Sequence, residues 1–335
     1  MRRKVWVVTV AVGLVSILLG SGWVLGAEKV VIKLGHHHTP RGIVDQAANK
    51  FKEVISAKSH GAIEVQVFPG GQLGQEMEAI DGVHLGTIDM SIVSPGLMGK
   101  YHPIMGLDAL PYLFTDWKHV DRALNGPAGE KIVELMLKRS NIHILRFLHL
   151  GFRDMLFVDK KIETVEQMRG LKMRAPEAWA WIRMYELLGS KPTPITWGEV
   201  YSGLQTKIVD GMDSPPQMML DMKFFEVAKH VLKTNCMFST ITLVIHEKFY
   251  QRLPEASRKV LRDSAAEAVD YVNWNVSYPA EQASYEKLKD RGLTVSETDR
   301  TAWRKKVLPQ HEEYAKLRGP EAKELIDMVY KLSAK

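Results

Sequence analysis

The chain has 335 residues, 45% of them hydrophobic and 25% charged, which is typical of a globular protein and long enough for two lobes with separate cores. The formal net charge is +6, but Arg2, Arg3 and Lys4 supply half of it and no basic run follows, so the composition argues against a nucleic-acid partner. The single cysteine, Cys236, excludes an intramolecular disulfide and a metal site built from cysteines.

The first 27 residues have the pattern of a secretory signal peptide. The basic start precedes an apolar run at 5–19, and small residues follow at 20–22 and 26–27. We expect cleavage after Gly26 or Ala27 and export to the periplasm, and an uncleaved membrane anchor is the alternative. No cysteine lies near the junction, which excludes a lipoprotein anchor.

Strands and helices alternate through the next part of the chain. The spacing of apolar residues separates the two, because a half-buried strand repeats every second residue and a helix every three to four. In chain order we predict a strand at 30–34, a helix opened by Thr39 and Pro40 that continues to 55, a strand at 63–67, a short helix at 77–84 and a strand at 88–93.

A second series of alternating elements begins near residue 142. Capping boxes at Thr164 with Gln167 and at Thr196 with Glu199 mark two helix starts. The predicted strands lie at 142–147, 155–158, 171–174, after 209, at 240–245 and at 293–295, and the helices at 164–170, 178–188, 196–208 and 255–290, with a kink at Pro279. This alternation predicts an α/β protein with mainly parallel sheets, and a ligand in the crevice beyond the strand ends.

Several segments resemble the solute-binding proteins of tripartite ATP-independent periplasmic (TRAP) transporters, the DctP family. They lie at 68–74 with 86–90, at 110–114, at 151–153, at 170–176 and at 192–211. The last is the most specific and contains Pro192-Thr193-Pro194, Glu199-Val200-Tyr201, Leu204-Gln205-Thr206 and Val209-Asp210-Gly211. Each segment is a weak signal alone, and their common order and spacing make a strong one.

The resemblance implies a two-lobed, periplasmic-binding-protein-like α/β fold with a hinge of crossing strands and a long helix that spans both lobes. We expect residues 28–150 with 239–278 to form the first lobe and residues 151–238 with 279–335 the second. It also implies a small organic acid as ligand, captured by hinge closure, and a small and a large membrane subunit as partners that use an ion gradient. No cofactor, metal or catalytic activity is expected, and the protein is expected to be a monomer or a homodimer.

Arg174 is the first candidate for ligand binding, because the resemblance assigns the arginine of its motif to the ligand carboxylate. A planar guanidinium donates two parallel hydrogen bonds to one carboxylate and keeps its charge. Arg153 follows Gly151-Phe152 and matches the family's second pocket arginine. Two arginines at one pocket repel each other unless an anion lies between them, so the pair predicts an anionic ligand or an acidic neighbour.

Asp213 and Ser214 stand where the family usually has Glu-Asn, and the asparagine there often contacts ligand. Serine offers one hydroxyl in place of an amide, which leaves the identity of the ligand open. Three roles are open for Asp213: orienting an arginine, accepting a ligand hydroxyl, or serving as a turn residue before proline. Glu177 either offsets the arginine pair, accepts ligand hydroxyls, or is a first-turn glutamate favoured by the helix dipole.

Trp197 opens a predicted helix and matches an aromatic position of the family that lines the pocket, where it would stack on a flat or cyclic ligand. From the first lobe we expect contacts by His38, Gln72 and Ser94. His36, His37 and His38 are consecutive, and neighbours on an extended chain point to opposite faces, so they do not form one tetrahedral metal site.

Two other functions compete with transport. A secreted hydrolase would need a nucleophile elbow or a His-Glu-x-x-His helix, and the sequence contains neither. A ligand sensor that docks to a receptor kinase would have the same sequence features, so the sequence leaves it open.

Overall fold

The structure is a computed structural model and describes residues 29–333. The predicted signal peptide lies outside the described residues. Within residues 29–333, no helix combines the length and the apolar character needed to cross a membrane.

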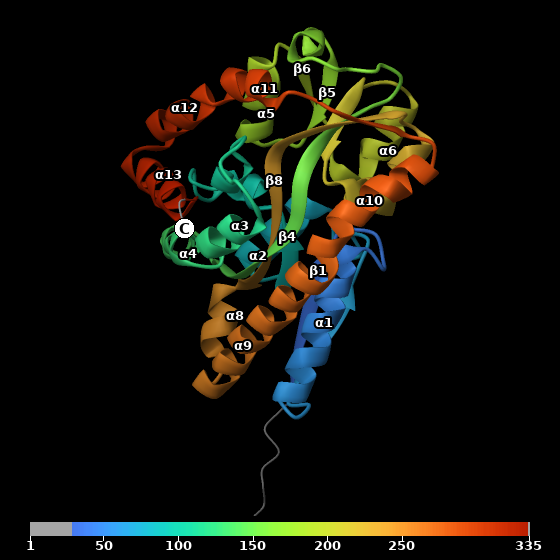
Figure 1. The fold of residues 1–335 in the computed structure, drawn as a ribbon. Coiled ribbons are helices and arrows are strands. Elements are labelled where there is room, and N and C mark those ends of the chain that lie inside the picture. The colour runs from blue at the N-terminus through green and yellow to red at the C-terminus, as the bar shows by residue number, and fades with distance from the viewer. Residues whose placement is uncertain (1–28, 334–335) are drawn as a thin grey trace, which may run out of the picture.

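Among the described residues, nine strands form one mixed sheet that runs through both lobes (Figure 1). Its order is β2-β1-β3-β8-β4-β7-β5-β6, with β9 paired to β8. The strands are β1 (Val30–His36), β2 (Ile63–Phe68), β3 (Met90–Val93), β4 (Ile142–Phe157), β5 (Lys172–Ala175), β6 (Lys191–Pro194), β7 (Gly211–Ser214), β8 (His230–His246) and β9 (Thr294–Glu297).

The long strands β4 and β8 join the lobes, and they add antiparallel pairings that the sequence did not predict to a sheet in which five of the eight described pairings are parallel. Within each lobe the β-α-β units pair in parallel, as β1 does with β2 and β3, and β5 with β6 and β7. The chain crosses to the second lobe in β4 and returns in β8, so these two strands pair antiparallel with each other, and also with β7 and β3 respectively. The separate strands predicted at 142–147 and 155–158 are parts of the single strand β4.

The middle of β4 carries two irregularities at the crossing. The register with β8 shifts between His149 and Gly151 and again between Arg153 and Met155. Gly151 has φ +109°, a conformation that L side chains rarely adopt. Such bulges change the direction in which a side chain points, and here they lie on both sides of Arg153.

The first lobe contains β1–β3 and two cores, one on each face of the sheet. Alternate residues of β8 belong to opposite cores, since Val244 packs in one and Leu243 and Ile245 in the other. Its helices include α1 (Ile43–Lys58), α2 (Glu76–Leu85), α3 (Trp117–Leu124), α4 (Pro127–Leu137) and α8 (Glu247–Arg252).

Helix α1 begins later than predicted. Its N-cap is Gly42 and its first residue Ile43, whereas the sequence placed the start at Thr39 and Pro40. Arg41 has φ +69°, which no right-handed helix includes, and its backbone N–H donates to Asp45 Oδ2 at 2.8 Å. Residues 39–42 are therefore a turn that precedes the helix.

The second lobe contains β5–β7 and a further pair of cores. Both faces of the sheet are again covered, because Met155 and Phe157 of β4 pack in one core and Leu156 in the other. The helices here include α5 (Trp179–Leu187), α6 (Val200–Gln205), α7 (Pro216–Asp221) and α11 (Arg300–Val307). The capping box predicted at Thr164 and Gln167 is confirmed, and it opens the short 3-10 turn Val165–Met168.

A long helical run crosses both lobes, as expected (Figure 1). It consists of α9 (Glu255–Val272), a π-helical turn at Asn273–Ser277 and α10 (Tyr278–Asp290). The irregular turn lies directly before Pro279, which has no N–H to continue the regular hydrogen-bond series. Arg146 of β4 forms a bidentate pair with Asp270 of α9, with Nη2 at 2.8 Å from each carboxylate oxygen.

The C-terminal helices α12 (Pro309–Arg318) and α13 (Pro320–Ser333) connect the lobes on the other side. Helix α12 packs against α5 of the second lobe, and α13 packs against α3 and α4 of the first. His119 Nε2 lies 2.8 Å from the backbone oxygen of Val329. The division predicted from the sequence assigned all of 279–335 to the second lobe, whereas α13 lies on the first.

Candidate functional site

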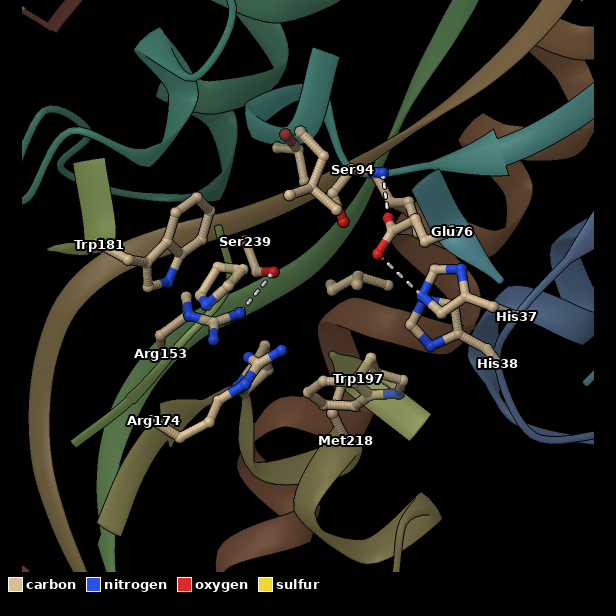
Figure 2. A pocket seen from close by; sticks show the side chains of 16 residues that line it. His37, His38, Glu76, Ser94, Arg153, Arg174, Trp181, Trp197, Met218 and Ser239 are labelled. Atoms are coloured by element: carbon tan, nitrogen blue, oxygen red, sulfur yellow. Dashed lines mark hydrogen bonds and ion pairs between the residues drawn. The ribbon is translucent and has the colours of Figure 1, made fainter. Parts of the chain in front are cut away.

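A cavity lies between the lobes, where the strand ends meet (Figure 2). Its inner part has a volume of about 60 Å³, and it adjoins an outer mouth of about 160 Å³ that shares His37, Glu76, Arg174 and Trp197. Strands β1, β3, β5 and β7 all end beside it, the position that α/β sheets use for ligands. The inner cavity is lined by His37, His38, Glu76, Ser94, Leu97, Leu150, Arg153, Arg174, Pro176, Trp181, Trp197, Pro215, Met218, Ser239, Thr240 and Ile241.

Arg174 comes from β5 and is 4% exposed. Its neighbours Met173 and Ala175 point into the second-lobe core, so the alternation of the strand turns Arg174 to the other face. Its Nε–H donates to the backbone oxygen of Ile195 at 3.0 Å, and its guanidinium carbon lies 5.5 Å from the centre of the Trp197 ring. Among the described residues, its two terminal nitrogens have no hydrogen-bond acceptor.

Arg153 comes from β4, between the two register shifts, and is held from behind by Asp213 of β7. Its Nε–H donates to the Asp213 carboxylate, and its Nη2 donates to the Asp213 backbone oxygen at 2.6 Å. Its Nη1 reaches Ser239 Oγ of β8 at 3.2 Å. The Asp213 carboxylate also accepts from Tyr185 Oη at 2.6 Å and Trp181 Nε1 at 3.3 Å. Arg153 is thus both fixed and paired.

The electrostatics of the cavity favour an anion at Arg174. Burial, and then the nearby charge of Arg153, lower the pKa of Arg174 to about 10, so it still carries its charge at neutral pH. A buried cation without an anionic partner is costly, and a ligand carboxylate would compensate it.

The opposite wall consists of His37, His38 and Glu76 (Figure 2). Glu76 accepts the Ser94 backbone N–H at 2.6 Å, and its other oxygen lies 3.2 Å from His37 Nε2. Burial lowers the pKa of His37 to about 3 and lowers that of His38 well below its ordinary value, so both rings are neutral. Figure 2 shows the arginines on one side of the cavity and this wall on the other.

The structure brings five of the nine predicted ligand-binding residues to the cavity: Arg153, Arg174, Trp197, His38 and Ser94. The others lie elsewhere. Asp213 stands behind Arg153, which corresponds to the role of orienting an arginine. Glu177 is exposed and lines the mouth. Ser214 is fully buried outside the lining, and Gln72 is exposed outside it.

Sequence reasoning missed Glu76, Ser239 and Thr240. The glycine-rich loop before Glu76, followed by a helix start, could have indicated a position at the strand ends like that of Arg174. Ser239 and Thr240 lie inside a β-branched strand, and only its pairing with β4 places them at the crossing. Trp181, interpreted as a core residue, is in the core and also lines the cavity, 5.4 Å from the guanidinium carbon of Arg153.

Cys236, the single cysteine, lies in the second-lobe core and outside the cavity lining. It is 1% exposed and donates to the backbone oxygen of Arg153 at 3.4 Å. Burial raises the pKa of its thiol well above the usual range, which disfavours the reactive thiolate.

Comparison with known proteins identifies the family of this chain. Residues 34–317 match the family described as bacterial extracellular solute-binding protein, family 7. The chain belongs to this family. The match covers the cavity, the crossing strands and the lobe-spanning helix, so the resemblance to TRAP solute-binding proteins is confirmed.

Three similar proteins illustrate the breadth of the family. A solute-binding protein of Roseobacter denitrificans is 31% identical to this one over 83% of this chain and 84% of its own. The C4-dicarboxylate-binding periplasmic protein DctP of Rhodobacter capsulatus is 30% identical over 88% of this chain and 89% of its own. The crystal structure of a TRAP periplasmic solute-binding protein from Polaromonas, bound to D-erythronate, is 28% identical with a TM-score of 0.84, covering 90% of this chain and 98% of that one.

Proposed function

We propose that this solute-binding protein captures a small organic carboxylate between its lobes, with Arg174 as the main contact of the carboxylate. One observation carries the proposal: Arg174 is 4% exposed and borders the cavity, and within residues 29–333 its guanidinium makes a hydrogen bond only through its Nε–H. A guanidinium matches a carboxylate with two parallel hydrogen bonds, and such charge-assisted bonds are about twice as strong as neutral ones. The similar proteins named above, for C4-dicarboxylates and D-erythronate, both involve carboxylates.

The proposal includes closure of a hinge. The ligand meets Arg174 and Arg153 on the second lobe and the crossing strand, and the first lobe then adds His38 and Ser94. The hinge lies where β4 and β8 cross, at the bulges beside Gly151. A change from about 1% to about 99% closed requires the ligand to favour the closed state by roughly 5.5 kcal/mol, and two buried arginine contacts with exclusion of water supply an energy of this order.

The closed form is the species that we propose the membrane subunits recognise. Those subunits are the small and large proteins of a TRAP transporter, and the protein would act in the periplasm after removal of its signal peptide. The proposed role is binding and delivery, without a chemical step on the ligand.

Titration calorimetry with organic acids on the mature protein tests the proposal. Arg174→Ala should weaken binding of the bound acid by on the order of 2–5 kcal/mol, the usual cost of truncating one partner of a buried charge pair. Arg169→Ala is the matched control, because Arg169 is an exposed arginine of the same lobe. Equal affinity in Arg174→Ala and the parent would contradict the proposal.

A further inference from the structure

The wall that faces the arginines is an acceptor of hydrogen bonds. Glu76 lines the cavity; one of its oxygens accepts the Ser94 backbone N–H, and the other lies 3.2 Å from His37 Nε2. A carboxylate has about four lone-pair positions, so capacity for further donors remains. Glu76 is also the first residue of α2, where the helix dipole stabilises a negative charge.

His38 is a second unsatisfied group in this wall. It is 6% exposed and lines the cavity, and neither of its ring nitrogens has a partner among the described residues. Its ring lies 4.2 Å from that of His37 and 5.8 Å from that of Trp197, centre to centre. A neutral imidazole has one N–H donor and one acceptor nitrogen. A hydroxyl group, which both donates and accepts, can pair with either nitrogen, whereas a carboxylate can only accept.

The charges at this end of the cavity disfavour a second carboxylate. Among the lining residues the only cations are Arg153 and Arg174, since both histidines are neutral. Arg153 is already paired with Asp213. Behind the lining, Asp108 accepts from Thr240 Oγ1 at 2.6 Å and adds another acidic group. A ligand carboxylate beside Glu76 would therefore meet a like charge without an unpaired cation to offset it.

We propose that the ligand is a hydroxylated monocarboxylate whose hydroxyl groups contact Glu76 and His38, and that this wall rejects dicarboxylates. The inference rests on the proposed function, in which Arg174 takes the single carboxylate. It deepens that function by assigning specificity to Glu76, a residue on the opposite lobe. The buried polar groups of the wall supply the discrimination, because an analogue without hydroxyls leaves them unpaired.

Two matched series of acids test this on the mature protein by titration calorimetry. The four-carbon series is D-erythronate, succinate and butanoate, and the six-carbon series is D-galactonate, galactarate and hexanoate. In at least one series, the hydroxylated monocarboxylate should bind at least tenfold more tightly than both the dicarboxylate and the unsubstituted acid. Orotate, a planar acid without aliphatic hydroxyls, is measured alongside.

Two variants assign the effect to the wall. Glu76→Gln keeps the shape but removes the charge, so it should reduce the preference over the dicarboxylate at least tenfold. His38→Phe keeps the ring beside Trp197 but removes both nitrogens. It should weaken the hydroxylated acid at least tenfold and the dicarboxylate by a smaller factor, whereas a general loss of structure would weaken both equally. Thermal unfolding checks that each variant folds. The expected change in either folded variant is sufficient to assign the preference to this wall.

The outcomes separate the two proposals. If a dicarboxylate, an unsubstituted acid or orotate binds as tightly as the hydroxylated acids, or if both variants keep the parent's preferences, this inference is wrong and carboxylate capture stands. If no acid of either series and no orotate binds, the proposed function fails, and this inference fails with it.

Discussion

Asp213 binds Arg153 twice, accepting the Nε–H on its carboxylate and the Nη2–H on its backbone oxygen at 2.6 Å. Arg174, the other arginine of the cavity, makes one hydrogen bond with the described residues, from Nε to the backbone oxygen of Ile195. The two arginines therefore differ in kind. Arg153 is fixed and paired, and shapes the potential of the cavity, while Arg174 has a free pair of terminal nitrogens to offer a carboxylate.

Asp213→Asn should therefore weaken ligand binding as well as the fold. The amide removes the charge that pairs Arg153, so a buried cation remains unpaired and Arg153 loses the carboxylate that holds its guanidinium in place for the ligand. We expect the free energy of unfolding to fall by roughly 3–5 kcal/mol and the affinity to fall on the order of tenfold or more. Chemical denaturation and titration calorimetry measure the two effects.

Asp159→Asn is the control for this substitution. Asp159 forms exposed ion pairs with Lys207 and Lys229 in the same lobe. Exposed pairs contribute about 0–1 kcal/mol, so this variant should bind and unfold almost as the parent does. Similar effects of the two substitutions would show that Asp213 has no special relation to the cavity.

Arg174→Lys tests whether the fork of the guanidinium matters or only its charge. Lysine keeps a positive charge but cannot donate to Ile195 and to both oxygens of a carboxylate in one plane. We expect a loss of about 1.5–3 kcal/mol in binding, the value of a hydrogen bond to a charged group, measured by calorimetry with the bound acid. An unchanged affinity would mean that a point charge is sufficient at this position.

The sequence predicted the elements that depend on local patterns. The alternation of strands and helices, the capping box at Thr164 and the place of Arg174 at a strand end all follow from neighbouring residues. The start of α1 did not, because the left-handed conformation of Arg41 comes from its contact with Asp45 and has no signal in residue type.

Features that depend on the crossing strands could not be predicted. The middle of β4 carries His149, Gly151 and Arg153, which interrupt the apolar pattern of a strand, and they remain in the strand because β8 pairs with it there. For the same reason Ser239 lies beside Arg153 although the two are far apart in the chain. The cavity residues of the second lobe were therefore easier to predict than those of the first lobe. Glu76, on the first lobe, is recognised only from its three-dimensional neighbours.

Gly151→Ala should destabilise the protein through the hinge. Gly151 has φ +109°, and an added Cβ would lie 3.0 Å from Glu281 Oε2 and 3.3 Å from Trp117 Cζ2. Strain of the backbone and this contact should together cost on the order of 2–4 kcal/mol in unfolding free energy. Gly170→Ala is the matched control, with φ +80° and no atom within 4 Å of the added carbon. It should cost about 1–2 kcal/mol, and an equal loss in both variants would show that only backbone strain matters.

Glu281 connects the lobes and should make stability depend on pH. It lies on α10, and its carboxylate accepts the indole N–H of Trp117 on α3. Burial raises the pKa of Glu281 from its ordinary value of 4.5 to about 7. The folded protein therefore holds this proton more tightly than the unfolded chain does, and the stability that this proton provides is complete below about pH 4.5 and lost as the pH rises through about 7.

Glu281→Gln isolates this contribution, because glutamine is neutral at every pH and its amide oxygen can accept the same N–H. The variant should gain stability relative to the parent as the pH rises from 4.5 to about 7, and the gain should then stay constant. Relative to the parent, the free energy of unfolding of the variant should be roughly 1–3 kcal/mol more favourable at pH 8 than at pH 4.5. Urea unfolding of both proteins across this pH range measures the difference between their free energies of unfolding. The other titrating groups are common to both proteins, so their contributions to this difference largely cancel. A difference that does not change with pH would mean that Glu281 titrates alike in the folded and unfolded chains.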